Sequence, residues 1–509
     1  MALPNTHHGP KEIAEILKNK KKIFFDGIGG VSMNSLAHIS HLRGYEVYGY
    51  DRTESAITDK LEAMGIKVYY TASAEHVKDC AALVYTVAIP ESNPEYSYAR
   101  DHGIPLISRA DYLGYIMTGY SERIGVSGTH GKSTTTGMLA KILSYAKKNP
   151  TVSGGAALKE TGEVDIIGGH DYFVFEACEY MDSFLDFNPT TAIVLNIELD
   201  HVDYFKSMEQ MRGSYLNFIT LPSCKNAVIN LDDENCRLVA AEAVKRGINV
   251  FSFSRTDKSA DYYSENEDTS DGYPEFDIMS KGEKLAHVKL KIPGAHYISD
   301  SLAAFAACII SGTTPEEIAG GLSEYRGICR RMENLGKTKN GAELYSDYAH
   351  HPTEIAATLS AARKITKGSL IIVFQSHTYS RTAELFDGFV SAFADSGVDK
   401  LILCPIYAAR ETNTYGITSE KLAGAICEKN KSVVCADSLE KAAEIAEAEG
   451  NDGDVIVVMG AGDVIKVAEI LEGNAKCNRQ LSPTLPDSPT HDKITPTIPA
   501  KWNGLRWST

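Results

Sequence analysis

The chain has 509 residues, of which 43% are hydrophobic, and its formal net charge is −16. This length allows roughly three globular domains, and the negative charge argues against broad nucleic-acid binding. No apolar run approaches the ~20 residues of a membrane span, and the amino terminus lacks the apolar core of a secretory signal. The ten scattered cysteines suit a reducing compartment. We therefore expect a cytoplasmic protein with no membrane insertion.

The first unit of the chain is a strand that runs into a glycine-rich turn, "KKIFFDGIGGVSM". A helix-like segment and the second strand "YEVYGYD" follow, and the latter ends at Asp51. This order of strand, turn, helix, strand and acid is typical of dinucleotide-type folds. Ser32 replaces the third glycine of the fingerprint, which weakens the case for a redox cofactor. The unit predicts a Rossmann-like domain whose turn contains Gly27, Gly29 and Gly30.

The second unit contains "GVSGTHGKSTTTGML", which differs from a standard phosphate loop because Val126 stands where a glycine is usual. The turn lies between a short strand and a helix, so that backbone N–H groups and a helix N-terminus point at one anion. Lys132 can neutralise the β- and γ-phosphates, and the Ser133 hydroxyl can bind Mg²⁺. The alternative is a glycine-rich turn with a solvated lysine. We predict a nucleotide site formed by Gly128, Thr129, His130, Gly131, Lys132, Ser133 and Thr134.

Short apolar strands and polar loops continue through the rest of the chain. The polar run at 254–277 predicts an inserted loop or hairpin, and the third unit contains four further strands, each followed by a polar or glycine-rich loop. We expect three α/β domains at 1–118, 119–328 and 329–473. The Pro- and Thr-rich segment 474–509 predicts a disordered tail.

Several motifs in this order resemble those of the Mur ligases: "GIGGVSM", "SGTHGKSTTT", "FEACEYMDSFL", "NIELDHVDYF", "SDYAHHPTEI" and "QSHTYSR". The resemblance covers nearly all of residues 21–472, and the family's own glycine spacing accommodates Val126. It implies an α/β, three-domain architecture: a Rossmann-like N-terminal domain for a UDP-sugar, a central P-loop ATPase domain and a Rossmann-like C-terminal domain for an amino acid.

The resemblance also implies a reaction. The family uses ATP with Mg²⁺ or Mn²⁺ to convert a carboxylate into an acyl phosphate, which an amine then attacks. The motifs are most similar to the branch that joins L-alanine to UDP-N-acetylmuramate in peptidoglycan synthesis. Three alternatives stay open: a ligase that recycles a tripeptide onto the same sugar, a NAD-dependent oxidoreductase, and a binding protein that has lost activity. The sequence does not decide between a monomer and a homodimer.

The resemblance supports the roles of Lys132 and Ser133 and implies roles for further residues. The catalytic set would comprise Lys132, Glu176, His201, His350, His377 and Arg381. Ser133, Glu176 and His201 would bind metal, His296, Arg331 and Asp347 would contact ATP, and His350, His377 and Arg381 would hold the amino acid, with Arg381 on its carboxylate. Gly27, Gly29, Gly30 and Asp51 would bind the UDP-sugar.

Some positions depart from the family pattern or carry no assigned role. Tyr297 replaces the asparagine that contacts adenine, and could stack on the purine or fill space. His130 could be structural or contact a ligand. Glu179, Asp182 and Asp200 are expected to be solvated or to support the ligands, and His351 to pack or cap a helix.

Overall fold

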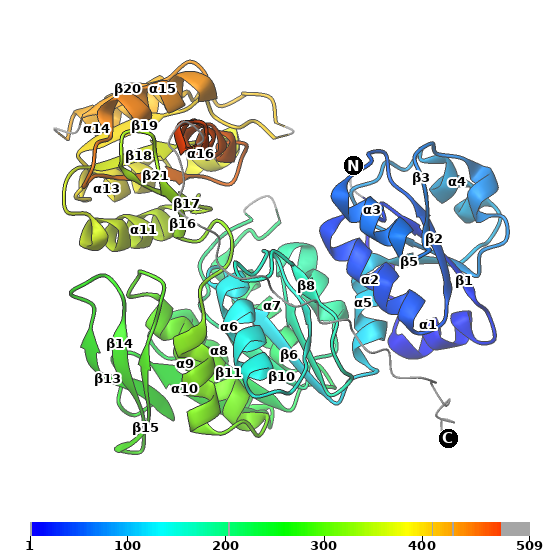
Figure 1. Ribbon diagram of the computed structural model, residues 1–509. Helices are drawn as coiled ribbons and strands as arrows, with labels where there is room; N and C mark the ends of the chain where they lie inside the picture. Colours follow the sequence, from blue (N-terminus) through cyan, green and yellow to red (C-terminus); the bar gives the residue numbers. More distant parts are fainter. Residues whose placement is uncertain (1–2, 202–203, 410, 430–431, 480–509) are drawn as a thin grey trace.

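The computed structural model describes residues 3–201, 204–409, 411–429 and 432–479 (Figure 1). Its strands form three sheets, each made largely of parallel strands with helices on both sides. The predicted α/β class is confirmed. Among the described residues, no helix is both long and apolar enough to span a membrane.

The first sheet is parallel throughout and has the strand order β3-β2-β1-β4-β5. Its buried strands alternate with helices, as the sequence predicts for a Rossmann-like unit. The strands are β1 (Lys22–Asp26), β2 (Glu46–Tyr50), β3 (Lys67–Tyr69), β4 (Ala82–Tyr85) and β5 (Leu106–Ser108). The helices are α1 (Pro10–Leu17), α2 (Val31–Leu42), α3 (Ala56–Ala63), the 3-10 turn η1 (Ala74–Val77), α4 (Pro94–Asp101) and α5 (Arg109–Met117).

The second sheet has ten strands in the order β15-β14-β13-β12-β11-β10-β6-β9-β7-β8. Its strands are β6 (Glu122–Ser127), β7 (Thr151–Ser153), β8 (Asp165–Ile166), β9 (Tyr172–Glu176), β10 (Thr191–Val194), β11 (Asn226–Asn230), β12 (Asn249–Ser254), β13 (Tyr262–Asp268), β14 (Glu275–Ser280) and β15 (Glu283–Lys289). Its helices are α6 (Lys132–Tyr145), η2 (Tyr180–Asp186), α7 (Met208–Ile219), α8 (Glu234–Lys245), α9 (Tyr297–Ile310) and α10 (Pro315–Glu324). The polar run at 254–277 forms the antiparallel strands β13 and β14, so of the two predicted alternatives it is the hairpin.

The third sheet has the order β16-β17-β21-β18-β19-β20 and is parallel except for the edge strand β16. Its strands are β16 (Glu333–Lys337), β17 (Glu343–Asp347), β18 (Leu370–Phe374), β19 (Lys400–Leu403), β20 (Val433–Cys435) and β21 (Val455–Met459). Its helices are α11 (Pro352–Ile365), α12 (Tyr379–Glu384), α13 (Phe386–Ala394), α14 (Ser419–Cys427), α15 (Leu439–Glu449) and α16 (Ile465–Arg479). Helix α16 continues past Gly473, where the third domain was expected to end, and the rest of the predicted tail, 480–509, lies outside the described residues.

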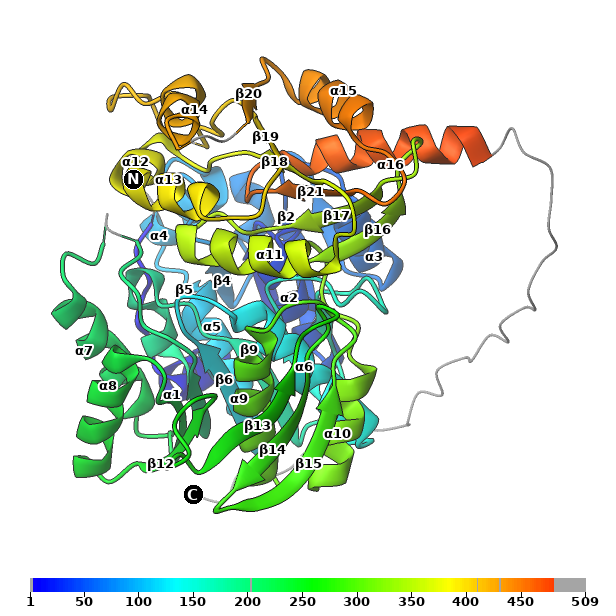
Figure 2. The same ribbon diagram turned by 90° about the vertical axis from the view of Figure 1, so that its left-hand side faces the viewer.

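The three sheets are arranged so that the third one lies over the second, and the first lies at its side (Figure 1). Helix α11 is the element of the third unit that faces the central one, as both views show (Figure 2). The first and second units meet closely at α5, where a Cβ on Gly114 would lie 2.2 Å from the Asp186 carbonyl oxygen. The residues of the predicted site therefore reach one another across unit boundaries.

Candidate active site

The predicted phosphate loop connects the buried strand β6 to helix α6. Gly128 and Gly131 have φ angles of 140° and 86°, which side-chain-bearing residues rarely adopt. Asn196 holds the loop from beyond β10: its Oδ1 accepts from the His130 N–H at 2.8 Å, and its Nδ2 donates to the His130 carbonyl at 3.0 Å. The loop is thus a fixed turn at a helix N-terminus, the geometry that suits an anion.

Lys132 lies at the base of this loop and is paired with a buried carboxylate. Its Nζ is 3.3 Å from Glu179 Oε2 and donates to the carbonyls of Gly128 and Thr129. Burial lowers the pKa of Lys132, but Glu179 and the neighbouring acidic groups outweigh it and raise the pKa to about 12. The lysine therefore keeps its charge. Two roles were expected for Glu179, a solvated residue or a support for a ligand. Because Glu179 is completely buried, the second role fits the structure.

Of the three residues expected to bind metal, two are hydrogen-bonded to each other and the third lies beside Glu179. Ser133 Oγ donates to Glu176 Oε1, and burial raises the pKa of Glu176. His201 Nε2 is 3.7 Å from Glu179 Oε1, an atom that has no hydrogen-bond partner in the described part of the chain. A hydroxyl in the first turn of α6 and a carboxylate at the end of β9 are donors that suit a hard divalent cation, and the Glu179 oxygen beside His201 fits the same group.

A cavity of about 310 Å³ opens next to the loop, between the central and third units. Of the predicted ATP contacts, those that line it are His130, Gly131, Thr134, His296 and Arg331. Tyr297 also lines it, with its ring centroid 4.0 Å from that of His296. Burial, with Arg331 and Arg255 nearby, lowers the pKa of His296 to about 4 and keeps that ring neutral.

Asp347 is placed differently from the other predicted ATP contacts. It ends β17, is buried, and accepts hydrogen bonds from the backbone N–H groups of Met332 and Ala349, both at 2.7 Å. It is absent from the residues that line the described cavity. Its contact with ATP stays a prediction, and its observed bonds organise the chain around the third sheet.

The residues predicted to hold the amino acid come together at the edge of the third unit. The ring centroids of His350 and His377 are 6.1 Å apart, and Arg381 Nη1 is 3.4 Å from His377 Nδ1. Burial, His350 and Arg381 lower the pKa of His377 to about 4. Arg381 Nη2 also donates at 3.1 Å to Asp200, which belongs to the same loop as His201. Asp200 is therefore an ion-pair partner across the unit boundary, and its pKa lies well below the usual range because Arg381 and His201 outweigh its burial.

The glycine turn of the first unit forms a separate site at the carboxyl ends of β1 and β2. Gly27 has φ of 84°, and Gly30 is the N-cap of α2. The Gly29 N–H donates at 2.9 Å to Asp51 Oδ2, and a Cβ on Gly29 would lie 2.8 Å from the same oxygen. The turn is thus packed too tightly for a side chain at Gly29, and Asp51 fixes its shape.

Sequence reasoning missed two carboxylates that contact His130. His130 Nε2 is 3.4 Å from Glu198 Oε2, and its Nδ1 is 3.0 Å from Glu354 Oε1. Both acids belong to quoted motifs, "NIELDHVDYF" and "SDYAHHPTEI", but their contacts cross 68 and 224 positions of the chain. The spacing of either motif therefore gives no sign of the contact. His351 caps α11 by accepting from the Thr353 N–H, one of the two roles expected for it.

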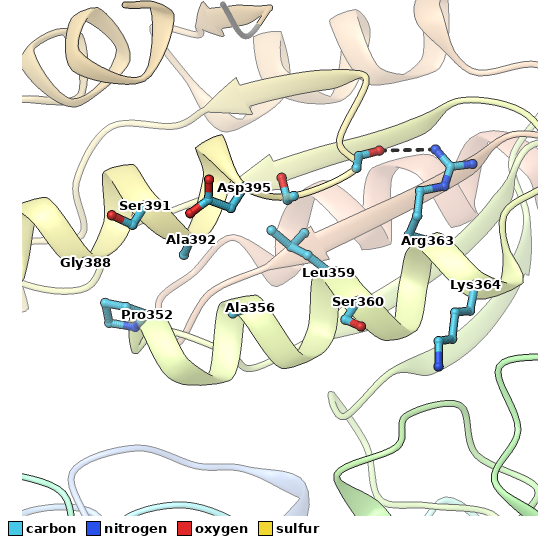
Figure 3. A pocket seen from close by; sticks show the side chains of 12 residues that line it. Pro352, Ala356, Leu359, Ser360, Arg363, Lys364, Gly388, Ser391, Ala392 and Asp395 are labelled. Carbon is cyan, nitrogen blue, oxygen red and sulfur yellow. Dashed lines mark hydrogen bonds between the residues drawn. The ribbon is translucent and has the colours of Figure 1, made fainter. Parts of the chain in front are cut away.

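A larger hollow of about 690 Å³ lies between α11 and α13 (Figure 3). It is lined by Pro352, Ala356, Leu359, Ser360, Arg363, Lys364, Gly388, Ser391, Ala392, Asp395, Ser396 and Gly397. None of these residues belongs to the predicted site. Arg363, its main charged group, is already bonded to the Gly397 carbonyl at 3.2 Å. The smaller cavity is therefore the better candidate for the reaction.

Comparisons with known proteins agree with the three units. Family models described as "Mur ligase family, catalytic domain", "Mur ligase middle domain" and "Mur ligase, glutamate ligase domain" match residues 22–121, 126–308 and 330–462. The UDP-N-acetylmuramate–L-alanine ligase of Caldicellulosiruptor saccharolyticus is 43% identical over 452 residues, which are 88% of this chain and 98% of that protein. The protein of the same name from Clostridium acetobutylicum is 42% identical over 89% of this chain and 98% of its own length.

Solved structures show the same architecture. The crystal structure of UDP-N-acetylmuramate-alanine ligase from Thermotoga maritima has a TM-score of 0.74 and 24% identity, and covers 91% of this chain and 100% of its own. The murein peptide ligase from Psychrobacter arcticus has a TM-score of 0.65 and 23% identity, and covers 89% of this chain and 98% of its own. At these identities the likeness supports the fold alone.

Proposed function

We propose, because this chain belongs to the Mur ligase family, that it joins L-alanine to the carboxylate of UDP-N-acetylmuramate while ATP is converted to ADP. The observation that carries the proposal is the 43% identity with an enzyme of that name, over 98% of its length. The reaction would belong to peptidoglycan precursor synthesis, and we expect it to take place in the cytoplasm, with the enzyme as a monomer or homodimer.

The division of labour follows the three units. We assign the UDP-sugar to residues 1–118, ATP to 119–328 and the amino acid to 329–473. The glycine turn and the N-terminus of α2 would receive the diphosphate, with Asp51 on the uridine side. The geometry that supports this assignment is the tight glycine turn that leads from β1 into the N-terminus of α2, where Gly30 is the N-cap.

Lys132, with its pKa raised to about 12, would place a permanent positive charge beside the ATP phosphates. Arg331 lines the same cavity and would add a second charge from the third unit. Ser133, Glu176 and His201 would hold Mg²⁺ or Mn²⁺, since Ser133 and Glu176 are hydrogen-bonded to each other and His201 lies beside the unpartnered oxygen of Glu179. When bound, ATP supplies the phosphoryl group that makes the sugar carboxylate an acyl donor, and the cation neutralises the charge that develops.

The amino acid would lie on the third unit, in the group formed by His350, His377 and Arg381. A guanidinium pairs well with a carboxylate, so Arg381 would orient alanine by releasing Asp200. His377 is neutral at pH 7 because its pKa is lowered to about 4, so it can accept a hydrogen bond from the amine. This arrangement requires the third unit to close over the central one before reaction.

Phosphate release by the purified protein tests the proposal directly. The assay contains ATP, Mg²⁺ and UDP-N-acetylmuramate with each candidate acceptor in turn: L-alanine, glycine, L-serine, D-glutamate and the recycled tripeptide. We expect L-alanine to be the fastest, and glycine and serine to react weakly because one methyl group contributes only about 1–3 kcal/mol of discrimination. A faster reaction with the tripeptide would assign the chain to the recycling branch. An absorbance change with a nicotinamide cofactor, and no phosphate release, would make it an oxidoreductase.

A further inference from the structure

Glu354, in the first turn of α11, is surrounded by donors from both units of the active site. Its carboxylate side chain is only 10% exposed, and its charged partners in the described part of the chain are His130, Arg331 and His350. Oε1 lies 3.0 Å from His130 Nδ1 and 3.7 Å from Arg331 Nη1. Oε2 accepts from the His350 N–H at 3.1 Å and lies 3.3 Å from His350 Nδ1. One buried side chain therefore contacts three residues of the predicted site.

These three partners belong to different parts of the reaction. His130 lies in the phosphate loop of the central unit, Arg331 lines the nucleotide cavity, and His350 belongs to the amino-acid group. The contact with His130 crosses the boundary between the central and third units, at the face where α11 lies against the central unit (Figure 2). A neighbouring link supports it, because Thr353 Oγ1 donates at 3.0 Å to Glu198, which also contacts His130.

A buried carboxylate is favourable only while its donors surround it. The donors of Glu354, above all His130 and His350, overcome its burial and hold its pKa well below the usual range. If the third unit moved away, Glu354 would lose His130 and the phosphate loop would lose one of the two carboxylates on that ring. Docking of the third unit and the shape of the loop are thus linked through one side chain.

We propose that Glu354 is a positioning residue that couples closure of the third unit to the phosphate loop and, at the same time, to the amino-acid group. The identity of the two coupled substrates, ATP and L-alanine, rests on the function proposed above. The coupling itself depends only on the geometry of Glu354, so it can be tested without the complete reaction.

The first test uses the full-length protein without the sugar or the amino acid. Glu354→Gln keeps the size of the side chain and removes its charge, and Glu384→Gln is the matched control, an exposed glutamate on α12. We expect Glu354→Gln to bind a fluorescent ATP analogue about tenfold more weakly, and small-angle X-ray scattering to show a larger radius of gyration than for the wild type. Glu384→Gln should match the wild type in both. Unchanged nucleotide affinity and radius in folded Glu354→Gln would overturn the proposal.

The second test separates positioning from a loss of stability. If the wild type ligates L-alanine, Glu354→Gln should raise the KM values of both ATP and alanine, whereas His350→Ala should raise mainly that of alanine. Glu354→Asp, which keeps the charge on a shorter side chain, should bring both KM values part of the way back to those of the wild type. Circular dichroism melts run beside the assays identify an unfolded variant. A rise in the KM of only one substrate would contradict the coupling, and failure of the wild type to ligate alanine would contradict the proposed function while leaving the binding test intact.

Discussion

Replacing Glu179 by glutamine should destabilise the nucleotide-free enzyme, because Glu179 is the buried counter-charge of Lys132. The Nζ and Oε2 atoms are 3.3 Å apart, and the Glu179 and Lys132 side chains are 1% and 17% exposed. With an effective dielectric constant of about 20, two unit charges at this distance attract by about 5 kcal/mol. The carboxylate's own desolvation cost disappears in the variant, so we expect a net loss of about 3 kcal/mol in the free energy of unfolding.

The measurement is urea unfolding of the wild type and of Glu179→Gln, with and without ATP and Mg²⁺. Lys132 retains the Gly128 and Thr129 carbonyls, so the variant should still fold. ATP should stabilise the variant more than the wild type, because the phosphates supply the anion that the buried lysine lacks. Glu209→Gln is the control, since the Glu209 side chain is 88% exposed and should leave stability unchanged. Equal stability of Glu179→Gln and wild type without ATP would refute the reasoning.

The remaining predictions concern substrates and ionisation. Arg381→Ala should raise the KM of L-alanine strongly and that of ATP much less, as steady-state phosphate release would show; equal effects on both would remove Arg381 from the amino-acid site. Gly29→Ala should weaken UDP-N-acetylmuramate binding in calorimetry, because its Cβ would lie 2.8 Å from Asp51 Oδ2 and 2.9 Å from Thr58 Cγ2; unchanged affinity would place the sugar elsewhere. NMR should show the His377 ring titrating near pH 4, since burial, His350 and Arg381 disfavour its charged form. Protonating this ring in acid therefore costs stability that is present at higher pH. A midpoint near the ordinary 6.5 would contradict the described surroundings.

The fold was largely predictable because it depends on local signals. Apolar strands, glycine turns and helical segments follow one another in "KKIFFDGIGGVSM" and "RIGVSGTHGKS", and each gave the order of elements that the structure has. The end of the third unit was harder to place, because α16 extends beyond Gly473 into a segment whose composition predicts disorder. Composition describes an average over a window, whereas a helix ends at a particular residue.

The active site was predictable as a set of chemical groups but not as a set of contacts. The phosphate loop carries its own signal, since Gly131, Lys132 and Ser133 are adjacent in sequence and lie at one turn before α6. Glu179 and Asp200 were expected in the same loops as the metal ligands, but a sequence position does not show whether a carboxylate is solvated or pairs with Lys132 or Arg381. The Glu179–Lys132 pair depends on how the loop after β9 folds against the phosphate loop, and the Asp200–Arg381 pair depends on how the third unit lies on the central one.

The ion pairs across this boundary bear on how the enzyme would work. Arg381 is bonded to Asp200 and His130 to Glu354, so side chains of this chain contact the groups predicted to receive alanine and to border ATP. A ligand gains affinity only to the extent that its contacts exceed those it replaces. Alanine would exchange one carboxylate for another at Arg381, which costs little, whereas ATP would enter a cavity that His130 and Glu354 already line together. The same interdomain contacts would therefore let alanine replace Asp200 at Arg381 easily, and would keep the phosphate loop in one shape.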